Sequence, residues 1–283
     1  MKRGTPNRSR RGMLLAVSAG ALLLAGLPGR SVMAAKDPTL ARRSALVIGN
    51  AAYTDAPLRN PINDARLVSE TLVEIGFDVY LLEDGSMGDM LGSLRRWLQT
   101  SANAEVRAFY FAGHGTQYKG GNYLVPVDMA IRAESEITRH AVALSSIVDT
   151  LSAQEKGVNF VFVDACRTDP SALLKNAPLT RGIDDPFRPG FQPTEAPRGT
   201  VVAYSTSPGS LAADGKAGRN SVFSQALATY LKEPGLPVET MFKRIRASVM
   251  RATRNTQVPW ESSSLVGDFC FSPGEKGSCG YRR

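Results

Sequence analysis

Apolar residues along the chain alternate between short continuous runs and longer stretches in which they recur every three to four positions. The short runs are rich in β-branched and aromatic residues and predict buried strands, whereas the longer stretches predict amphipathic helices. Predicted strands cover residues 44–50, 77–82, 106–111, 159–166, 200–205 and 269–271, with a short extended segment over residues 123–127. Predicted helices cover residues 63–75, 87–98, 144–151, 221–231 and 238–250. Strands that alternate with helices indicate an α/β fold whose central sheet is mostly parallel and is flanked by helices on both faces.

The predicted elements belong to one domain. No linker separates independent apolar cores, so we expect a single α/β domain over residues 41–275, followed by a tail over residues 276–283. Residues 168–199 interrupt the alternation, because they are rich in proline and have no apolar period. We expect them to form a long surface loop, and a loop of that length inside a domain is usually functional or cleavable.

Residues 1–35 predict an export signal. A basic start is followed by an apolar run over residues 13–27 and by a small-residue cleavage site at residues 32–34. The motif at residues 9–14 resembles a twin-arginine signal, with a Sec-type signal as the alternative. An uncleaved anchor fits less well, because the run is shorter than the ~20 residues that span a bilayer. The protein is therefore expected to be periplasmic or extracellular.

Most of the positive charge belongs to this signal. The formal net charge is +8, and residues 1–35 hold six basic residues and no acid, so that only two excess positive charges remain. Nucleic-acid binding needs a clustered basic face, for which a small scattered excess gives no support.

The chain has three cysteines. Cys270 and Cys279 lie close together near the end, where an oxidising compartment would permit a disulfide. Cys166 is then the odd cysteine, and by itself it is either a reactive thiol or a buried small apolar residue.

Cys166 ends one predicted strand, and a histidine follows another. Side chains alternate along a strand, so Phe162, Asp164 and Cys166 are expected to share one face. His114 lies in a glycine-flanked turn directly after the strand over residues 106–111. Two parallel strands would bring His114 beside Cys166 at the carboxyl edge of the sheet, where open α/β sheets bind their ligands. The pair predicts nucleophilic catalysis, and the alternative is a turn histidine and a buried thiol.

Residues 109–115 and 161–167 carry a resemblance to a known family. The sequences Phe-Tyr-Phe-Ala-Gly-His-Gly and Val-Phe-Val-Asp-Ala-Cys-Arg resemble the paired histidine and cysteine motifs of the caspase-like cysteine peptidases, in particular their metacaspase-like bacterial members of the C14 type. Residues 45–50, 58–65 and 203–209 resemble the family's first strand, its Asn-Asp-Ala segment and the strand that opens its small-subunit region. The resemblance implies a caspase-like three-layer α/β/α sandwich. It implies a large-subunit-like part over residues 41–167, an intersubunit-like loop over 168–199 and a small-subunit-like part over 200–275.

The resemblance implies a catalytic dyad with an oxyanion hole. Cys166 would attack as a thiolate, and His114 would protonate the leaving amine and then activate water. The backbone N–H groups of Gly115 and Cys166 would bind the oxyanion. No third member of a triad is evident, and His140 lies in a polar stretch that predicts a surface position. A serine hydrolase that uses Ser205 or Ser207 would lack the Gly-x-Ser-x-Gly motif.

It also implies an acidic pocket for the substrate residue before the cut. Asp64 and Asp164, with Ser205, would bind Arg or Lys, because paired carboxylates are stabilised by a cation and reject an acid. Asp164 stands where animal caspases have Gln, and Ala112 where some metacaspases have Ser. Other roles remain open, since Asp64 also suits the first turn of a helix and Asp164 could hydrogen-bond a loop.

If the enzyme cuts after basic residues, the loop over residues 168–199 is a hypothetical self-cleavage segment. Its basic residues are Lys175, Arg181, Arg188 and Arg198. Metacaspases often need calcium, but the acids of this loop, such as Asp184 and Asp185, form no recognisable calcium site. We therefore expect no cofactor and leave calcium dependence open.

Two functions are consistent with the sequence. The first is a cysteine-type endopeptidase that acts on protein or peptide substrates with Arg or Lys at the cleavage site, without nucleic acid and without a stable membrane span. The alternative is a catalytically silent caspase-like binding or scaffold protein.

Overall fold

A computed structural model describes residues 42–54, 56–129, 136–154, 156–166, 191–192, 194–207, 218–274 and 279. The predicted export signal, the basic residues 175, 181 and 188 of the loop, and most of the tail lie outside the described residues. All described residues belong to one unit by their backbone contacts.

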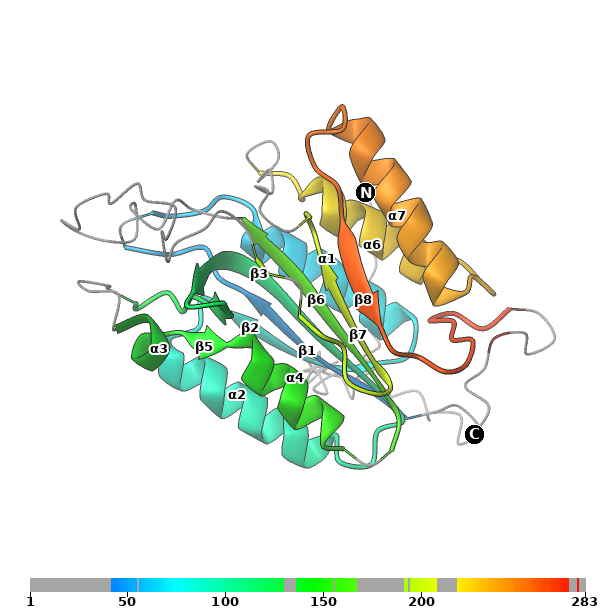
Figure 1. Cartoon of the computed structure of the whole chain (residues 1–283), viewed down its shortest axis with the longest axis horizontal. Helices are drawn as coiled ribbons and strands as arrows, with labels where there is room; N and C mark the ends of the chain where they lie inside the picture. Colours follow the sequence, from blue (N-terminus) through cyan, green and yellow to red (C-terminus); the bar gives the residue numbers. More distant parts are fainter. Residues whose placement is uncertain are drawn as a thin grey trace, which may run out of the picture. The chain divides into compact units, whose positions relative to one another are not determined.

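A mostly parallel sheet forms the centre of the fold (Figure 1). Its strands are β1 (Arg43–Gly49), β2 (Asp78–Glu83), β3 (Val106–Tyr118), β6 (Val158–Cys166), β7 (Thr200–Tyr204) and β8 (Trp260–Ser263), with the short β4 (Gly121–Leu124) and β5 (Val142–Ala143) beyond one end. The main strands follow the order β2-β1-β3-β6-β7-β8, and only β8 is antiparallel to its neighbour. The predicted α/β class with a mostly parallel sheet is confirmed.

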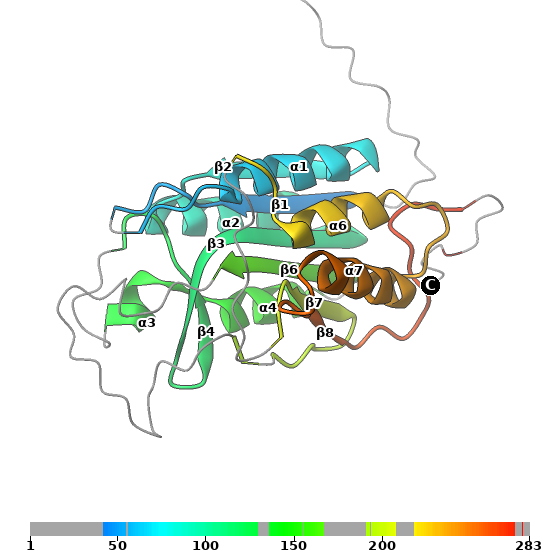
Figure 2. The same ribbon diagram turned by 90° about the horizontal axis from the view of Figure 1, so that it is seen from above.

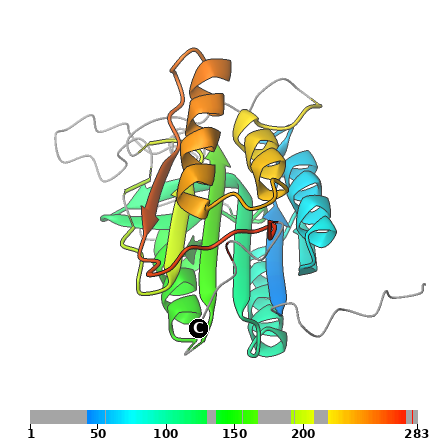
Figure 3. The same ribbon diagram turned by 90° about the vertical axis from the view of Figure 1, so that its right-hand side faces the viewer.

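Helices cover both faces of this sheet. Figure 3 shows α7 (Val238–Ala252), α6 (Val222–Leu231) and α1 (Pro61–Glu74) side by side on one face. On the other face lie α2 (Met87–Thr100) and α4 (Leu144–Ser152), with the short α3 (Ile137–His140) near β5 (Figure 1). No helix in the described ranges is long and apolar enough to cross a membrane.

Alternation along β6 explains why both faces are covered. Phe160 and Phe162 belong to the core beneath α1, α6 and α7, whereas Val161 and Val163 belong to the core beneath α2 and α4. All four side chains are almost fully buried. A strand that is apolar at every position needs a layer on each side, which is the arrangement of parallel sheets in α/β proteins.

Helix α1 begins at Pro61, two residues before the predicted start at residue 63. Its N-cap is Asn60, and Pro61 occupies the first turn. Proline is well suited there, because its fixed backbone angle matches a helix and the missing N–H would have no helical partner. The earlier start still leaves Asp64 in the first turn, where the N–H of Asp64 donates to the carbonyl of Asn60 at 3.0 Å.

The predicted strand over residues 269–271 is wrong. Phe269 and Phe271 are buried, but their segment is not a strand, and their rings pack on Phe160 at centroid distances of 4.7 and 4.6 Å. The last strand in the described part is instead β8, whose mostly polar sequence lacks the apolar signal because it lies at an edge of the sheet. Cys270 and Cys279 are joined by a disulfide.

Candidate active site

His114 lies opposite Cys166 on two adjacent parallel strands. β3 and β6 pair in register from Val106 opposite Val158 to His114 opposite Cys166, where β6 ends. The expected turn at His114 is wrong, because β3 continues to Tyr118. Beyond the end of β6, β3 pairs with β4 in an antiparallel hairpin, and this partner keeps the glycine-rich segment extended (Figure 2). The two carboxyl-terminal positions that the sequence singled out are therefore neighbours across the sheet.

The imidazole of His114 is buried and contacted on two sides. Its Nε2 lies 2.6 Å from the backbone oxygen of Ala56, and its ring packs on Tyr53 with the centroids 4.3 Å apart. A carbonyl oxygen can only accept, so Nε2 carries the proton and the basic lone pair of the neutral ring is on Nδ1. Sequence reasoning missed the Ala56 carbonyl, because a backbone oxygen has no side-chain signature.

The N–H of Gly115 is directed away from β4. Gly115 lies opposite Leu124, while in the adjoining pair the N–H of Val125 donates to the carbonyl of His114 at 3.0 Å. Hydrogen-bonded and non-hydrogen-bonded pairs alternate in an antiparallel ladder, so the N–H of Gly115 points to the other side of β3, on which β6 ends. A Cβ on Gly115 would lie 2.2 Å from Cζ of Phe191, so only glycine allows this ring to pack so closely.

Phe191, Gln192 and Thr194, from the predicted loop, are attached to this edge of the fold. Gln192 pairs with the side-chain amide of Asn122 in β4 through two hydrogen bonds of 2.8 Å. The hydroxyl of Tyr204 donates to Thr194 at 2.6 Å. Burial raises the pKa of Tyr204 to about 12, so this hydroxyl keeps its proton at neutral pH.

Asp64 and Asp164 are both buried, and one serine connects them. Asp64 Oδ1 accepts a hydrogen bond from the backbone N–H of Ser221 at 2.7 Å. Asp164 Oδ2 accepts from the hydroxyl groups of Ser221 and Ser224, the second at 2.6 Å. Ser221 is also the N-cap of α6, because its Oγ accepts from the N–H of Ser224 at 2.9 Å. The two acids thus lie in one polar cluster at the N-terminus of α6.

Burial raises the pKa of Asp164 above its ordinary value of 3.8. Hydrogen bonds from Ser221, Ser224, Ser205 and Tyr110 lower it, but they offset the burial only in part. A cation close to a buried carboxyl group of raised pKa would stabilise its ionised form and so lower that pKa.

Ser205 belongs to the same cluster. It directly follows β7, where its N–H donates to the carbonyl of Val163 at 2.9 Å and its carbonyl accepts from Nε2 of Gln257 at 2.8 Å. Its hydroxyl hydrogen-bonds Asp164. The predicted substrate-binding residues Asp64, Asp164 and Ser205 therefore lie together, and Ser221 and Ser224 are additions that sequence reasoning missed, although Ser221 carried a helix-cap signal.

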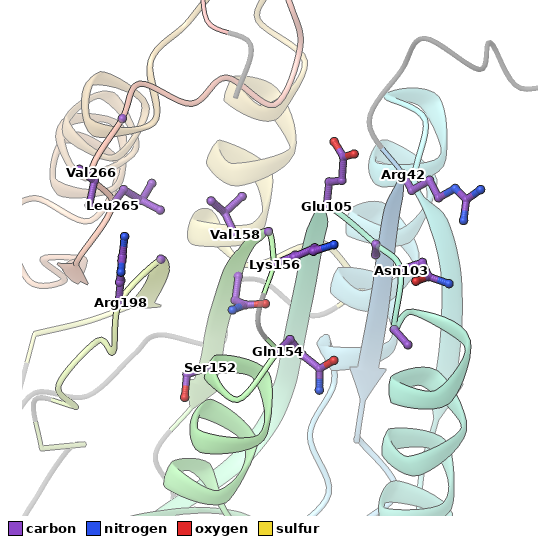
Figure 4. Close-up of a pocket in the computed structure, with 16 residues that line it drawn as sticks. Arg42, Asn103, Glu105, Ser152, Gln154, Lys156, Val158, Arg198, Leu265 and Val266 are labelled. Carbon is purple, nitrogen blue, oxygen red and sulfur yellow. The ribbon is translucent and has the colours of Figure 1, made fainter. Parts of the chain in front are cut away.

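Two other features lie away from this cluster. His140 is exposed at the end of α3, as predicted. An open depression of about 1110 Å³ lies at the amino-terminal edge of the strands, lined by Glu105 and Gly157, which precede β3 and β6. Figure 4 shows Arg42 and Arg198 on opposite sides of it, with Lys156 between them. No group of three potential metal-ligating side chains occurs in the described ranges.

An α/β sandwich that places a histidine opposite a cysteine on two adjacent parallel strands is the arrangement expected of the cysteine peptidase class. The chain belongs to the peptidase C14 caspase domain family, whose family model matches residues 42–270. It is 27% identical over 143 residues to human (Homo sapiens) mucosa-associated lymphoid tissue lymphoma translocation protein 1, and 28% identical over 131 residues to the mouse (Mus musculus) homolog. These matches cover 50% and 46% of this chain but only 17% and 15% of those proteins.

The fold is similar to a solved caspase structure. Caspase-1 from Spodoptera frugiperda superposes with a TM-score of 0.60 at 17% identity, over 83% of this chain and 92% of that chain. The expected caspase-like sandwich is thus confirmed.

Proposed function

We propose that the protein is a cysteine-type endopeptidase that hydrolyses peptide bonds after Arg or Lys, with Cys166 as nucleophile and His114 as acid and base. The observation that carries the proposal is the register of β3 and β6, which pairs His114 with Cys166 at the carboxyl edge of the sheet. Family membership supports peptidase chemistry in general.

The catalytic steps follow from these positions. In the neutral imidazole the basic nitrogen is Nδ1, because Nε2 bonds the carbonyl of Ala56. The thiol of Cys166 would lose its proton to His114, and the thiolate would attack the scissile carbonyl to form a thioester while His114 returns the proton to the leaving amine. Water, deprotonated by His114, would then hydrolyse the thioester. The N–H groups of Gly115 and Cys166 would stabilise the oxyanion.

The preference for a basic residue is proposed from the cluster around Asp164. Two buried carboxyl groups are linked by Ser221, whose backbone N–H donates to Asp64 and whose hydroxyl donates to Asp164. An Arg or Lys side chain would stabilise the ionised form of Asp164, whereas an acidic side chain would be repelled.

The substrates would be proteins or peptides, and the loop over residues 168–199 would itself be one, through cleavage after a basic residue. The proposal includes export to the periplasm or the outside of the cell and requires no cofactor. The scaffold function remains the alternative if no turnover occurs.

A fluorogenic peptide assay tests the proposal. Purified protein is incubated under mild reduction, with and without calcium, with peptides that end in Arg, Lys or Asp, beside the Cys166→Ala and His114→Ala variants. We expect hydrolysis of the Arg and Lys peptides by the wild type alone. Hydrolysis of none would favour the scaffold, and hydrolysis of the Asp peptide would refute the acidic pocket.

A further inference from the structure

Tyr53 makes more contacts with His114 than packing requires. Its hydroxyl accepts a hydrogen bond from the backbone N–H of His114 at 2.9 Å and donates to the carbonyl of Val125 at 3.0 Å. The N–H of Val125 in turn donates to the carbonyl of His114. The backbone of His114 is therefore held on both sides by a closed set of three hydrogen bonds. Tyr53 is 4% exposed, so water competes little for them.

The ring of Tyr53 holds the side chain of the same histidine. Its centroid lies 4.3 Å from that of the imidazole, with the planes inclined at 44°. On the far side, Nε2 bonds the carbonyl of Ala56, three residues along the chain from Tyr53. Tyr53 and Ala56, which both follow β1, thus determine the position and tilt of the imidazole ring of His114 and which of its nitrogens carries the proton.

This segment is itself fixed to the end of β2. Asp84 Oδ1 accepts hydrogen bonds from the N–H groups of Ala51 and Ala52 at 2.7 and 2.8 Å. The carbonyl of Ala51 accepts from the N–H of Tyr53 at 2.9 Å and from that of Leu58 at 2.9 Å. Tyr53 is therefore presented to His114 by an anchored turn.

The chain also leaves space for the hydroxyl of Tyr53. A Cβ on Gly113, directly before His114, would lie 2.5 Å from that oxygen. The glycine between Ala112 and His114 thus allows a hydroxyl group to reach the backbone of β3, which any larger residue would prevent.

We propose that Tyr53 is a positioning residue that holds the imidazole of His114 for proton exchange with Cys166. The inference rests on the proposed peptidase function. A histidine that moves by a fraction of an ångström transfers protons less efficiently, and its cationic form stabilises the thiolate less. Tyr53 acts through His114 and not on the substrate, so kcat and the ionisation of the thiol should change while KM does not.

Tyr53→Phe is the test, because it removes one oxygen and keeps the ring. Tyr230→Phe is the matched control, since the hydroxyl of Tyr230 bonds Ser248 at 2.9 Å between α6 and α7. The rate of Cys166 alkylation by iodoacetamide is measured against pH, with Cys166→Ala as blank, beside kcat and KM for an Arg peptide. In Tyr53→Phe we expect the alkylation midpoint to move to higher pH and kcat to fall by about tenfold or more at constant KM. Tyr230→Phe should leave all three unchanged.

Gly113→Ala is a second test of the same contact, because the added Cβ on β3 would displace the hydroxyl group of Tyr53. It should shift the alkylation midpoint in the same direction, and this decides the matter if Tyr53→Phe does not fold. A folded Tyr53→Phe protein with lower thermal stability but an unchanged midpoint and kcat would overturn the proposal. If the wild type hydrolyses no peptide, the proposed function fails, whereas the alkylation profiles still decide the role of Tyr53.

Discussion

Replacement of Asp164 by Asn tests the acidic cluster most directly. The two side chains have the same shape, and the amide oxygen of Asn can still accept the hydrogen bonds that Ser221 and Ser224 donate to Asp164 Oδ2. The change therefore removes the negative charge and leaves the packing of β6 against α6. Asp64 remains in place, bonded to the N–H of Ser221.

The size of the effect follows from the burial of Asp164, which is 4% exposed. Loss of one partner from a buried charge pair costs about 2–5 kcal/mol, and the remaining Asp64 places the expected loss near the low end. A loss of about 2–3 kcal/mol corresponds to about a 30- to 150-fold lower kcat/KM for an Arg peptide. A peptide with citrulline, the neutral counterpart of arginine, should change little.

The assay measures kcat/KM for the Arg peptide and the citrulline peptide, with the wild type and with Asp164→Asn, between about pH 5 and about pH 9. Because burial raises the pKa of Asp164, its charge appears as the pH rises, and the Arg/citrulline ratio of the wild type should rise with it. The ratio for Asp164→Asn should be small and insensitive to pH. Alkylation of Cys166 should be preserved, which shows that the nucleophile is intact. An unchanged ratio in a folded, alkylatable Asp164→Asn protein would refute the role of this carboxyl group.

Three further outcomes are expected. Folding raises the pKa of Asp164, so as the pH rises the unfolded chain loses this proton before the folded protein does. The melting temperature of the wild type relative to Asp164→Asn should therefore fall between pH 3.8, the ordinary pKa, and the raised pKa of the folded protein. A difference in melting temperature that stays constant over this pH range would argue against a buried carboxyl group. Gly115→Ala should lose about 1–3 kcal/mol in chemical denaturation through overlap with the ring of Phe191, and the same loss in a Phe191→Ala background would contradict this cause. Purified wild type should fragment on incubation after one or more basic residues between positions 168 and 199, as read by mass spectrometry, and equal fragmentation of Cys166→Ala would exclude self-cleavage.

The sheet was predictable where burial determines the sequence. Residues of β6 are apolar on both faces because two cores require them, and this pattern identifies a central parallel strand without further information. β8 was not predictable, since an edge strand needs one neighbour only and its residues are largely polar. The aromatic residues Phe269 and Phe271 led to the prediction of a strand that does not exist, because deep burial favours aromatic residues in irregular segments as well as in strands.

The residues of the candidate site were predictable only where their side chains have a recognisable chemical role. The proximity of His114 and Cys166 follows from the parallel pairing of β3 and β6, since parallel neighbours in register bring equivalent positions together. The carbonyl of Ala56 and the hydroxyl of Tyr53 contact His114 from the segment that follows β1. The local sequence of that segment does not indicate that it will lie beside His114 in the fold. Phe191 is likewise placed by a tertiary contact, through Gly115 on β3.

Helix capping and the proposed selectivity are combined in Ser221. Its Oγ accepts from the N–H of Ser224 to begin α6, and the hydroxyl donates to Asp164 while its backbone N–H donates to Asp64. A serine N-cap contributes typically ~1 kcal/mol to a helix, so a change at this residue alters stability and the acidic cluster together. The two roles are separable, because Ser221→Asp retains a capping oxygen but brings a third carboxylate beside Asp164 and Asp64. Ser221 therefore joins the start of α6, the end of β6 and the first turn of α1, and its hydroxyl partly offsets the rise that burial causes in the pKa of Asp164.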